Sequence, residues 1–274
     1  MEHFKDTVAI VTGGASGIGR ALCEELSQRG TAEVIVADIN AEGARQVASA
    51  ITTRGGRAHA AHLDISQAGD VQKLVVDTAS KHGRLDYMFN NAGIAIGGEM
   101  RDMGLEHWRR ILDVNLWGVI YGTTSAYKVM VKQGFGHIVN TASLAGLTPV
   151  PLITAYATTK HAVVGLSTSL RAEGAELGVK VSVVCPGFIR TGIIDAIVNV
   201  TKLEKAYPDV SSINMMDAGD CARIILRGVV RNKAIITVTA FACFLWWLSR
   251  LHPAIAPLVF RKRLNEFRAL RSES

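Results

Sequence analysis

Tyr156 and Lys160 lie four residues apart in a segment predicted to be helical from about Thr154 toward Leu177. Side chains at positions i and i+4 of a helix project from one face, so the ammonium group can lie beside the phenol. A free tyrosine has a pKa of about 10 and is a poor base at neutral pH, but a nearby positive charge stabilises the phenolate. The pair is therefore a candidate acid–base unit, although most such pairs in helices are only surface neighbours.

A second group of residues has the composition of a phosphate-binding turn. A strand predicted at Val8–Val11 is followed by the sequence TGGASGIG at positions 12–19 and then by a helical pattern. Glycines let the backbone approach a pyrophosphate, and a helix N-terminus supplies free N–H groups and a positive dipole end. An ordinary glycine-rich turn is the alternative. The candidate contact residues here are Gly13, Ser16, Gly17, Ile18 and Gly19.

Asp38 strengthens the nucleotide interpretation. It follows the second predicted strand, nineteen residues after Gly19, which is about where an acid that binds the adenosine ribose is expected. A carboxylate there accepts hydrogen bonds from the ribose hydroxyls and repels a 2′-phosphate. The next residue, Ile39, is not a cation that would pair with that phosphate. NAD is therefore preferred over NADP, and Arg20, close to the phosphate loop, keeps NADP as the alternative.

Short apolar runs rich in β-branched residues alternate with longer helical patterns, which is typical of βαβ units and a parallel sheet. We predict one α/β domain with a doubly wound, Rossmann-type sheet of seven parallel strands. Such sheets bind ligands outside the carboxyl ends of their strands. The catalytic domain is expected to span residues 1–239, followed by a hydrophobic and basic helical extension at 240–274. The predicted strands are Val8–Val11, Val34–Ala37, Ala58–Leu63, Tyr87–Phe89, His137–Asn140, Val181–Val184 and Ile235–Val238.

Taken in order, these motifs resemble the short-chain dehydrogenase/reductase family from about Thr7 to Val238. The resemblance is carried by the Gly-x-x-x-Gly-x-Gly spacing at 13–19, LDI at 63–65, NNAG at 90–93, Tyr-x-x-x-Lys at 156–160 and PG at 186–187. It implies a nicotinamide-dependent alcohol dehydrogenase or ketone reductase whose catalytic residues are Asn115, Ser143, Tyr156 and Lys160.

The resemblance also implies a role for each catalytic residue. Tyr156 would be the general acid/base, and Lys160 would also bind the nicotinamide ribose. Ser143 would hydrogen-bond the reacting oxygen, and Asn115 would support a water that relays protons from Lys160. Taken singly, Ser143 is equally a helix N-cap and Asn115 a satisfied polar residue. The cofactor-binding residues implied outside the glycine-rich turn are Asp38, Ile39, Asp64, Ile65, Asn91, Ala92, Gly93, Tyr156, Lys160, Pro186, Gly187, Ile189 and Thr191.

The segments expected to contact substrate are mostly apolar, which predicts a secondary alcohol or ketone on a lipid-like, terpenoid or steroid-like skeleton. Arg190 is an alternative contact for a carboxylate or a CoA phosphate. No His, Cys, Asp or Glu cluster has metal-ligand spacing, so no metal is expected. The apolar positions are Ile94, Ile96, Met100, Leu144, Leu147, Val150, Ile193, Ile194, Ile197, Val198, Met215 and Met216.

Positive charge is concentrated at the C-terminus. Residues 231–274 contain eight Lys or Arg and two Glu, which accounts for the whole net charge of +6, so a nucleic-acid partner is not expected. The apolar run near 241–251 is interrupted by Arg250 and His252, well short of the ~20 residues of a membrane span. It fits a buried terminal helix or an oligomer contact. The alternative is an amphipathic element that rests on an anionic membrane or covers an apolar pocket.

Four scattered cysteines and an N-terminus unlike a signal peptide predict a cytoplasmic protein, with possible peripheral membrane contact through residues 240–271. The family resemblance implies a homodimer formed by the helices at Asn115–Val131 and Tyr156–Leu177, with a homotetramer as the alternative. Two other function classes compete with the oxidoreductase. They are a catalytically silent NAD-binding sensor and a membrane-associated interaction protein or scaffold.

Overall fold

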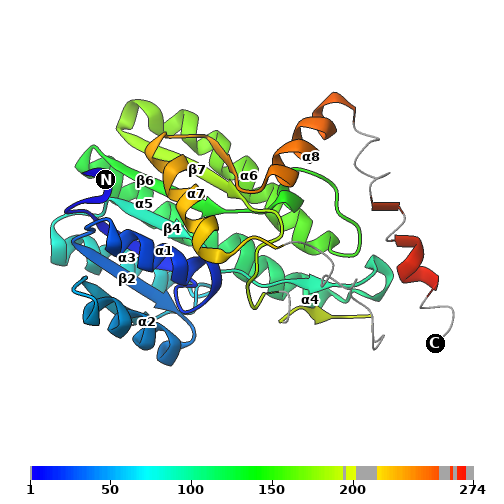
Figure 1. Cartoon of the computed structure of the whole chain (residues 1–274), viewed down its shortest axis with the longest axis horizontal. Coiled ribbons are helices and arrows are strands. Elements are labelled where there is room, and N and C mark those ends of the chain that lie inside the picture. The colour runs from blue at the N-terminus through cyan, green and yellow to red at the C-terminus, as the bar shows by residue number, and fades with distance from the viewer. Residues whose placement is uncertain (1, 194–195, 202–214, 253–259, 262–263, 270–274) are drawn as a thin grey trace.

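A computed structural model describes residues 2–193, 196–201, 215–252, 260–261 and 264–269. Its centre is a seven-stranded parallel sheet with the strand order β3-β2-β1-β4-β6-β7-β9 (Figure 1). The order reverses between β1 and β4, which makes the carboxyl ends of these two strands the topological switch point. The predicted single α/β domain with seven parallel strands is confirmed.

The strands differ from the predicted ones mainly at their ends. β7 begins two residues before the predicted position, because it continues through the exposed Lys180. β3 and β9 each end one residue earlier than predicted. The bounds are β1 Val8–Thr12, β2 Glu33–Asp38, β3 Ala58–His62, β4 Tyr87–Asn90, β6 Gly136–Thr141, β7 Val179–Cys185 and β9 Ile235–Thr237.

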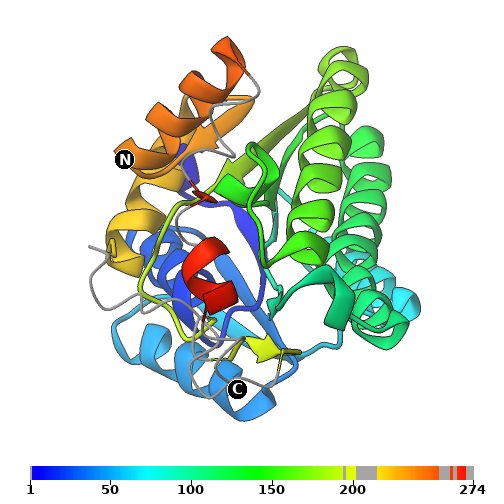
Figure 2. The ribbon, with the colours of Figure 1, turned by 90° about the vertical axis from the view of Figure 1, so that its right-hand side faces the viewer.

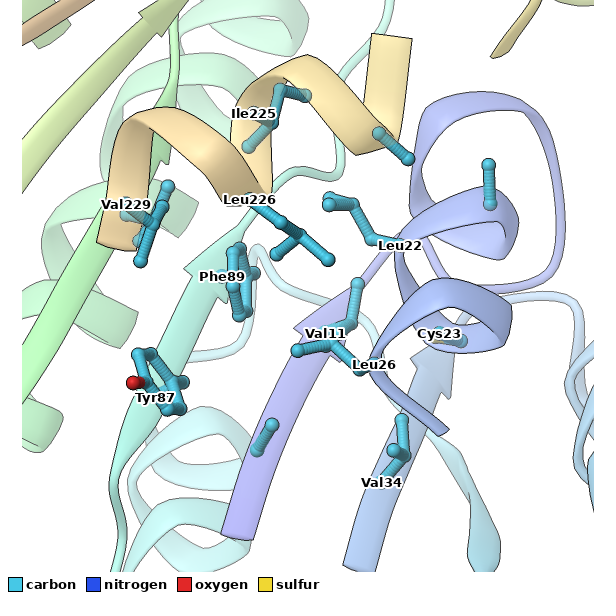
Figure 3. Close-up of a cluster of buried hydrophobic side chains, with 14 of the residues drawn as sticks. Val11, Leu22, Cys23, Leu26, Val34, Tyr87, Phe89, Ile225, Leu226 and Val229 are labelled. Carbon is cyan, nitrogen blue, oxygen red and sulfur yellow. The ribbon is translucent and has the colours of Figure 1, made fainter. Parts of the chain in front are cut away.

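Helices cover both faces of the sheet, and this is why the central strands are apolar without alternation. One face carries α1 (Gly17–Gln28), α2 (Ala41–Thr53) and α7 (Ala218–Val230), which share a single apolar cluster with the sheet (Figure 3). The other face carries α3 (Ala68–His82), α5 (Gly118–Gln133) and α6 (Thr154–Gly174). The side chains labelled in Figure 3 are Val11, Leu22, Cys23, Leu26, Val34, Tyr87, Phe89, Ile225, Leu226 and Val229.

Shorter elements lie around the carboxyl end of the sheet. A second, two-stranded parallel sheet pairs β5 (Ile96–Gly97) with β8 (Val198–Asn199). Two-residue strands have no measurable periodicity, and the sequence did not predict them. The remaining helical elements are 3₁₀ turns at Glu2–Phe4, Met100–Asp102, Leu144–Gly146 and Ala175–Leu177, α4 (Leu105–Leu112), a π-helical turn (Asp113–Trp117) and α8 (Ala240–Leu251).

A buried polar network attaches α5 and α6 to the sheet. The Asn90 side chain donates to Asn140 Oδ1 at 2.8 Å and to Thr123 Oγ1 at 3.2 Å, and Asn140 Nδ2 donates to Ser167 Oγ at 3.0 Å. All four residues are almost fully buried, so each unmade bond would leave a desolvated polar group. The network fixes the distance between the ends of β4 and β6 and the helices beside them.

The C-terminal part of the chain packs onto this body. On α8, Ala242 and Leu245 form an apolar cluster with Leu144 and Phe260. Residues 264–269 are helical and lie in front of the carboxyl end of the sheet when the molecule is viewed from that side (Figure 2). Within the described residues no helix is long and apolar enough to cross a membrane. A division of the chain at residue 239 stays a prediction.

Candidate active site

A cavity of about 640 Å³ lies at the switch point, within the range of small-molecule sites. Nearly every residue expected to bind cofactor lines it. Gly19, Asn115 and Ser143 are not among its lining residues, and each contributes through a neighbour. The predicted residues that line it are Gly13, Ser16, Gly17, Ile18, Asp38, Ile39, Asp64, Ile65, Asn91, Ala92, Gly93, Tyr156, Lys160, Pro186, Gly187, Ile189 and Thr191.

The glycine-rich turn is shaped by close backbone approaches. Gly13 has a φ of +66°, and a Cβ there would lie 2.8 Å from the Cα of Ala92. At Gly19 a Cβ would lie 2.0 Å from the Gly13 carbonyl oxygen, so this glycine packs the helix against the turn rather than facing the cavity. Ser16 is the N-cap of α1, and its hydroxyl makes no capping hydrogen bond within the described structure. The first N–H groups of α1 therefore stay available for an anion.

Asp38 holds this turn in place from the end of β2. Its Oδ2 accepts the Ala15 N–H at 3.0 Å and its Oδ1 accepts the Asn40 N–H at 2.9 Å. Arg20, the residue that kept NADP as an alternative, is paired with Glu24 at 2.9 Å and does not line the cavity. The exposed side chain of Ile39 lines it instead. Asp38 thus places a carboxylate in the cavity wall, and the described cations that line the cavity are Arg110 and Lys160.

Thr12 is a positioning residue that the sequence analysis missed. Its hydroxyl oxygen accepts the backbone N–H groups of Asn91 and Ala92 at 3.0 and 3.1 Å, and its carbonyl accepts Asn91 Nδ2 at 3.1 Å. These bonds join the ends of β1 and β4 at the switch point. A hydroxyl at the last residue of the first strand was the only signal available, and it is a weak one.

Asp64 also lines the cavity and is held ionised. Its Oδ1 accepts the Ser66 N–H at 2.9 Å and the Ser66 hydroxyl at 2.8 Å. These hydrogen bonds keep the pKa of the Asp64 carboxyl below its usual value. The group is therefore a hydrogen-bond acceptor at neutral pH, as a contact with an adenine amino group requires.

Tyr156 and Lys160 lie together on the first turns of α6, as predicted. Lys160 Nζ is 5.5 Å from the centre of the Tyr156 ring and donates to the Thr141 carbonyl at 2.9 Å. Burial lowers the pKa of Lys160 to about 8, because a desolvated ammonium is costly. Burial also raises the pKa of Tyr156, while a hydrogen bond with the Ser143 side chain lowers it.

The tyrosine therefore departs from one expectation. The sequence analysis expected Lys160 to lower the pKa of the phenol, but burial is the larger influence and raises it. Desolvation disfavours the charged phenolate, as it disfavours the charged ammonium of Lys160. Cys185, at the end of β7, also interacts with Lys160. Burial raises the pKa of its thiol to about 12, so the group stays neutral.

Ser143 and Asn115 support the site from outside the cavity wall. Ser143 caps the 3₁₀ turn that follows β6, accepting the Ala145 N–H at 3.2 Å, so its capping and site roles coexist. Asn115 lies fully buried in the π-helical turn. Its Oδ1 accepts the Ile94 N–H and its Nδ2 donates to the Ile94 carbonyl, both at 2.8 Å. The Asn115 amide thus fixes the loop after β4, and a role in proton relay stays a prediction.

The substrate end is less well predicted. Of the apolar positions expected there, Ile94, Ile193 and Ile197 line the cavity. Ile96 and Val198 pack in a cluster beside it, and Leu144 and Val150 pack against the C-terminal segment. Met216 packs on the main core, Met100 is exposed, and Ile194 lies outside the described residues. Arg190 is exposed and does not line the cavity. Residues that the sequence analysis missed are Leu63, Ser66, Ala95, Arg110, Val114, Thr141, Ala142, Ile153 and Gly192.

Comparison with known proteins decides the family. The profile described as short chain dehydrogenase matches residues 7–201. The chain belongs to the short-chain dehydrogenase family. It is 39% identical over 194 residues to the cyclohexanol dehydrogenase of an Acinetobacter species, a match covering 70% of this chain and 76% of that protein.

Two further similarities extend this result. The probable oxidoreductase EphD of Mycobacterium tuberculosis is 35% identical over 261 residues, which covers 92% of this chain but only 44% of that longer protein. A short-chain dehydrogenase/reductase from Burkholderia phymatum, solved in complex with NAD, superposes with a TM-score of 0.82 at 27% identity, covering 91% of this chain and 95% of the other. From these similarities, the protein described here is an oxidoreductase with a nucleotide-binding Rossmann fold. No metal-binding group of three or more His, Cys, Asp or Glu occurs in the described structure.

The buried pair predicts a pH-dependent rate. Lys160 Nζ lies 5.5 Å from the centre of the Tyr156 ring, and burial lowers the pKa of this ammonium to about 8, so the pair gives up a proton near that pH. We expect kcat/KM for alcohol oxidation to rise with pH and to level off above about 8, because this parameter reports ionisations of the free enzyme. Initial rates at saturating cofactor between pH 6 and 10 measure it. Lys160→Met should remove the step, Lys180→Met on the exposed part of β7 should keep it, and a flat wild-type profile would contradict the prediction.

Proposed function

We propose that this protein is an NAD-dependent dehydrogenase or reductase that transfers a hydride between NAD(H) and a secondary alcohol or ketone on an apolar skeleton. The observation that carries the proposal is the placement of Tyr156 and Lys160 on the wall of the same cavity as Asp38 and the glycine-rich turn. A base alone or a nucleotide site alone would leave the chemistry open. Together they match the chemistry named for the relatives, which are dehydrogenases.

The described residues fit the cofactor. The available N–H groups at the start of α1 suit a pyrophosphate, and the carboxylates of Asp38 and Asp64 suit the ribose and the adenine. NAD, when bound, supplies the acceptor for the hydride. The preference for NAD over NADP rests on Asp38, because its charge repels a 2′-phosphate and Arg20 is engaged by Glu24.

Tyr156 carries the proton in the proposed reaction. In oxidation its phenolate oxygen takes the hydroxyl proton of the alcohol, and in reduction its phenol returns a proton to the carbonyl oxygen. Ser143 hydrogen-bonds the phenol and is placed to orient the reacting oxygen. Lys160, held by the Thr141 carbonyl, favours the phenolate whenever the ammonium is charged. Asn115 keeps the loop bearing Gly93 and Ile94 against this pair.

The substrate class follows from the lining and from the relatives. Ile94, Ile153, Ile193 and Ile197 give the end of the cavity beside Tyr156 an apolar wall. Two of the relatives are named for cyclic alcohols: cyclohexanol, and 2,5-dichloro-2,5-cyclohexadiene-1,4-diol in Sphingobium indicum, whose enzyme is 40% identical over 196 residues. Both features favour a hydrophobic secondary alcohol or ketone of alicyclic, terpenoid, steroid-like or lipid character.

Replacement of the tyrosine tests the function. Tyr156→Phe keeps the ring and its packing but removes the proton, so we expect turnover of cyclohexanol with NAD to fall by at least about 10²-fold, the usual contribution of a general acid/base. Binding of NADH, followed by fluorescence, should be unchanged. Tight binding of NAD by the wild type without turnover on any alcohol or ketone would favour the silent sensor instead.

Cofactor choice can be tested at Ile39. This side chain is 65% exposed, so Ile39→Arg should fold normally and place a cation beside a 2′-phosphate. We expect kcat/KM with NADP to increase by about tenfold, which corresponds to one exposed ion pair with a phosphate. Steady-state rates with both cofactors provide the measurement, and equal use of NAD and NADP by the wild type would refute the assigned preference.

The assembly and location of the protein are also proposals. We infer a cytoplasmic homodimer or homotetramer that uses α5 and α6, beside the exposed Trp117 that stacks on Tyr121. A second surface lies on α8, where Phe241, Phe244 and Trp247 are each about half exposed along one face. Between Asp220 and Glu266 the sequence has no acidic residue and eight basic ones. Apolar and cationic groups in one segment suit an anionic lipid surface.

Vesicle binding tests the α8 surface. We expect the wild type to sediment with phosphatidylserine vesicles, less so at high salt, and the double variant Phe244→Ser with Trp247→Ser to stay in solution. Phe135→Ser, an exposed aromatic in the turn before β6, is the matched control and should bind normally. Absence of binding by the wild type would refute membrane contact. If the double variant instead changes the mass measured by light scattering, the α8 surface is a subunit contact.

A further inference from the structure

The C-terminal helical residues 264–269 touch two loops that are distant in the sequence. Phe267, only 5% exposed, packs with Leu152 in a small cluster that Leu264 also joins. One residue later, Arg268 Nε donates to Glu99 Oε1 at 2.9 Å. Leu152 belongs to the loop before α6, and Glu99 belongs to the loop after β5. Figure 2 shows this helical segment in front of the carboxyl end of the sheet.

The backbone conformation of Leu152 needs to be stabilised by neighbouring residues. Its φ of +67° places a branched, non-glycine residue in the left-handed region, a strained conformation that persists only when the surroundings hold it. Its carbonyl accepts the Gly98 N–H at 2.7 Å, so it also holds the loop after β5. The next residue, Ile153, lines the cavity, and Tyr156 follows on α6. The cover that Phe267 gives Leu152 therefore bears on the wall beside the tyrosine.

Glu99 connects the same helical segment to the other wall. Its carboxylate is 9% exposed and accepts from Arg101 as well as Arg268, and its N–H donates to Thr201 Oγ1 at 3.3 Å. Thr201 follows β8, the strand that pairs with β5, and Ile197 just before β8 lines the cavity. Burial raises the pKa of Glu99, but the hydrogen bonds from Arg268 and Arg101 outweigh it and keep the pKa low. The carboxylate is thus charged at neutral pH.

We propose that Phe267 and Arg268 form a C-terminal clasp that holds two substrate loops, residues 94–101 and 147–153, against the apolar end of the cavity. The proposal rests on the proposed function, because it assigns that end to the substrate. Phe267 and Arg268 are positioning residues, since neither lines the cavity. Loops that are ordered in advance lose less conformational entropy when substrate binds. The clasp therefore lowers KM for substrates that reach both loops and leaves proton transfer at Tyr156 unchanged.

Two arginines on the same carboxylate provide a matched comparison. Arg268→Gln removes the link between the C-terminal segment and the loop, whereas Arg101→Gln removes a partner from the same loop and of similar exposure, 60% against 56%. We expect Arg268→Gln to raise KM for cyclohexanol by about fivefold to tenfold with kcat nearly constant, the effect of losing one partly exposed charged hydrogen bond. KM for 2-propanol, which is too small to reach both loops, and the Kd for NADH should hardly change.

A double-mutant cycle and hydrogen exchange complete the test. Glu99→Gln and Arg268→Gln together should raise KM no more than Glu99→Gln alone, because Glu99→Gln already breaks the interaction with Arg268. Phe267→Ala should raise KM in the same selective way. Amides of both loops should exchange faster in Arg268→Gln than in Arg101→Gln. Equal effects of the two arginine variants, or unchanged exchange in both loops, would overturn the clasp. If the wild type turns over no alcohol, the proposed function fails while the exchange comparison still decides the clasp.

Discussion

The buried ammonium of Lys160 is the interaction on which the rest of the site depends. An ammonium removed from water without a carboxylate partner is among the least favourable arrangements in a folded protein. Lys160 is 3% exposed, and no ion pair within the described residues includes it. Its described partners are the Thr141 carbonyl at 2.9 Å and the face of the Tyr156 ring. A charge in this setting is sensitive to every nearby dipole, which is the property an acid–base site needs.

The end of β6 must therefore keep its position, because it supplies the hydrogen-bond acceptor for Lys160. Thr141 supplies the carbonyl, and the preceding residue, Asn140, is tied to Ser167, two turns beyond Lys160 on the same helix. Ser167 and Lys160 thus fix α6 to β6 at two points. Asn90 and Thr123 extend the attachment to β4 and α5. The fold and the chemistry share this network, so the buried amides that seem merely structural also determine where the base lies.

Local signals explain what the sequence predicted well. The seven strands, the glycine-rich turn and the Tyr–Lys spacing each depend on neighbouring residues. The right-handed crossover rule narrows the possible strand orders without fixing the observed one. Interactions between distant segments were not predictable. The amide of Asn115 fixes a backbone twenty-one residues away, and the hydroxyl of Thr12 holds residues almost eighty positions further on. The direction of the pKa shift at Tyr156 was missed because desolvation is a property of the packed site.

The residues that line the substrate end of the cavity also depend on contacts between distant segments, which the sequence does not predict. Leu144, Leu147 and Val150 were expected to face a substrate, since their composition matches a pocket wall. Leu144 instead packs with Ala242 and Phe260, and Leu152 packs with Phe267. A hydrophobic side chain does not encode which apolar neighbour covers it. Composition therefore cannot distinguish a residue that lines the cavity from a residue that packs behind the lining. The loop therefore presents Ile153 to the cavity while Leu144 and Leu152 contact the C-terminal segment, so changes in that segment can reach the substrate through the loop.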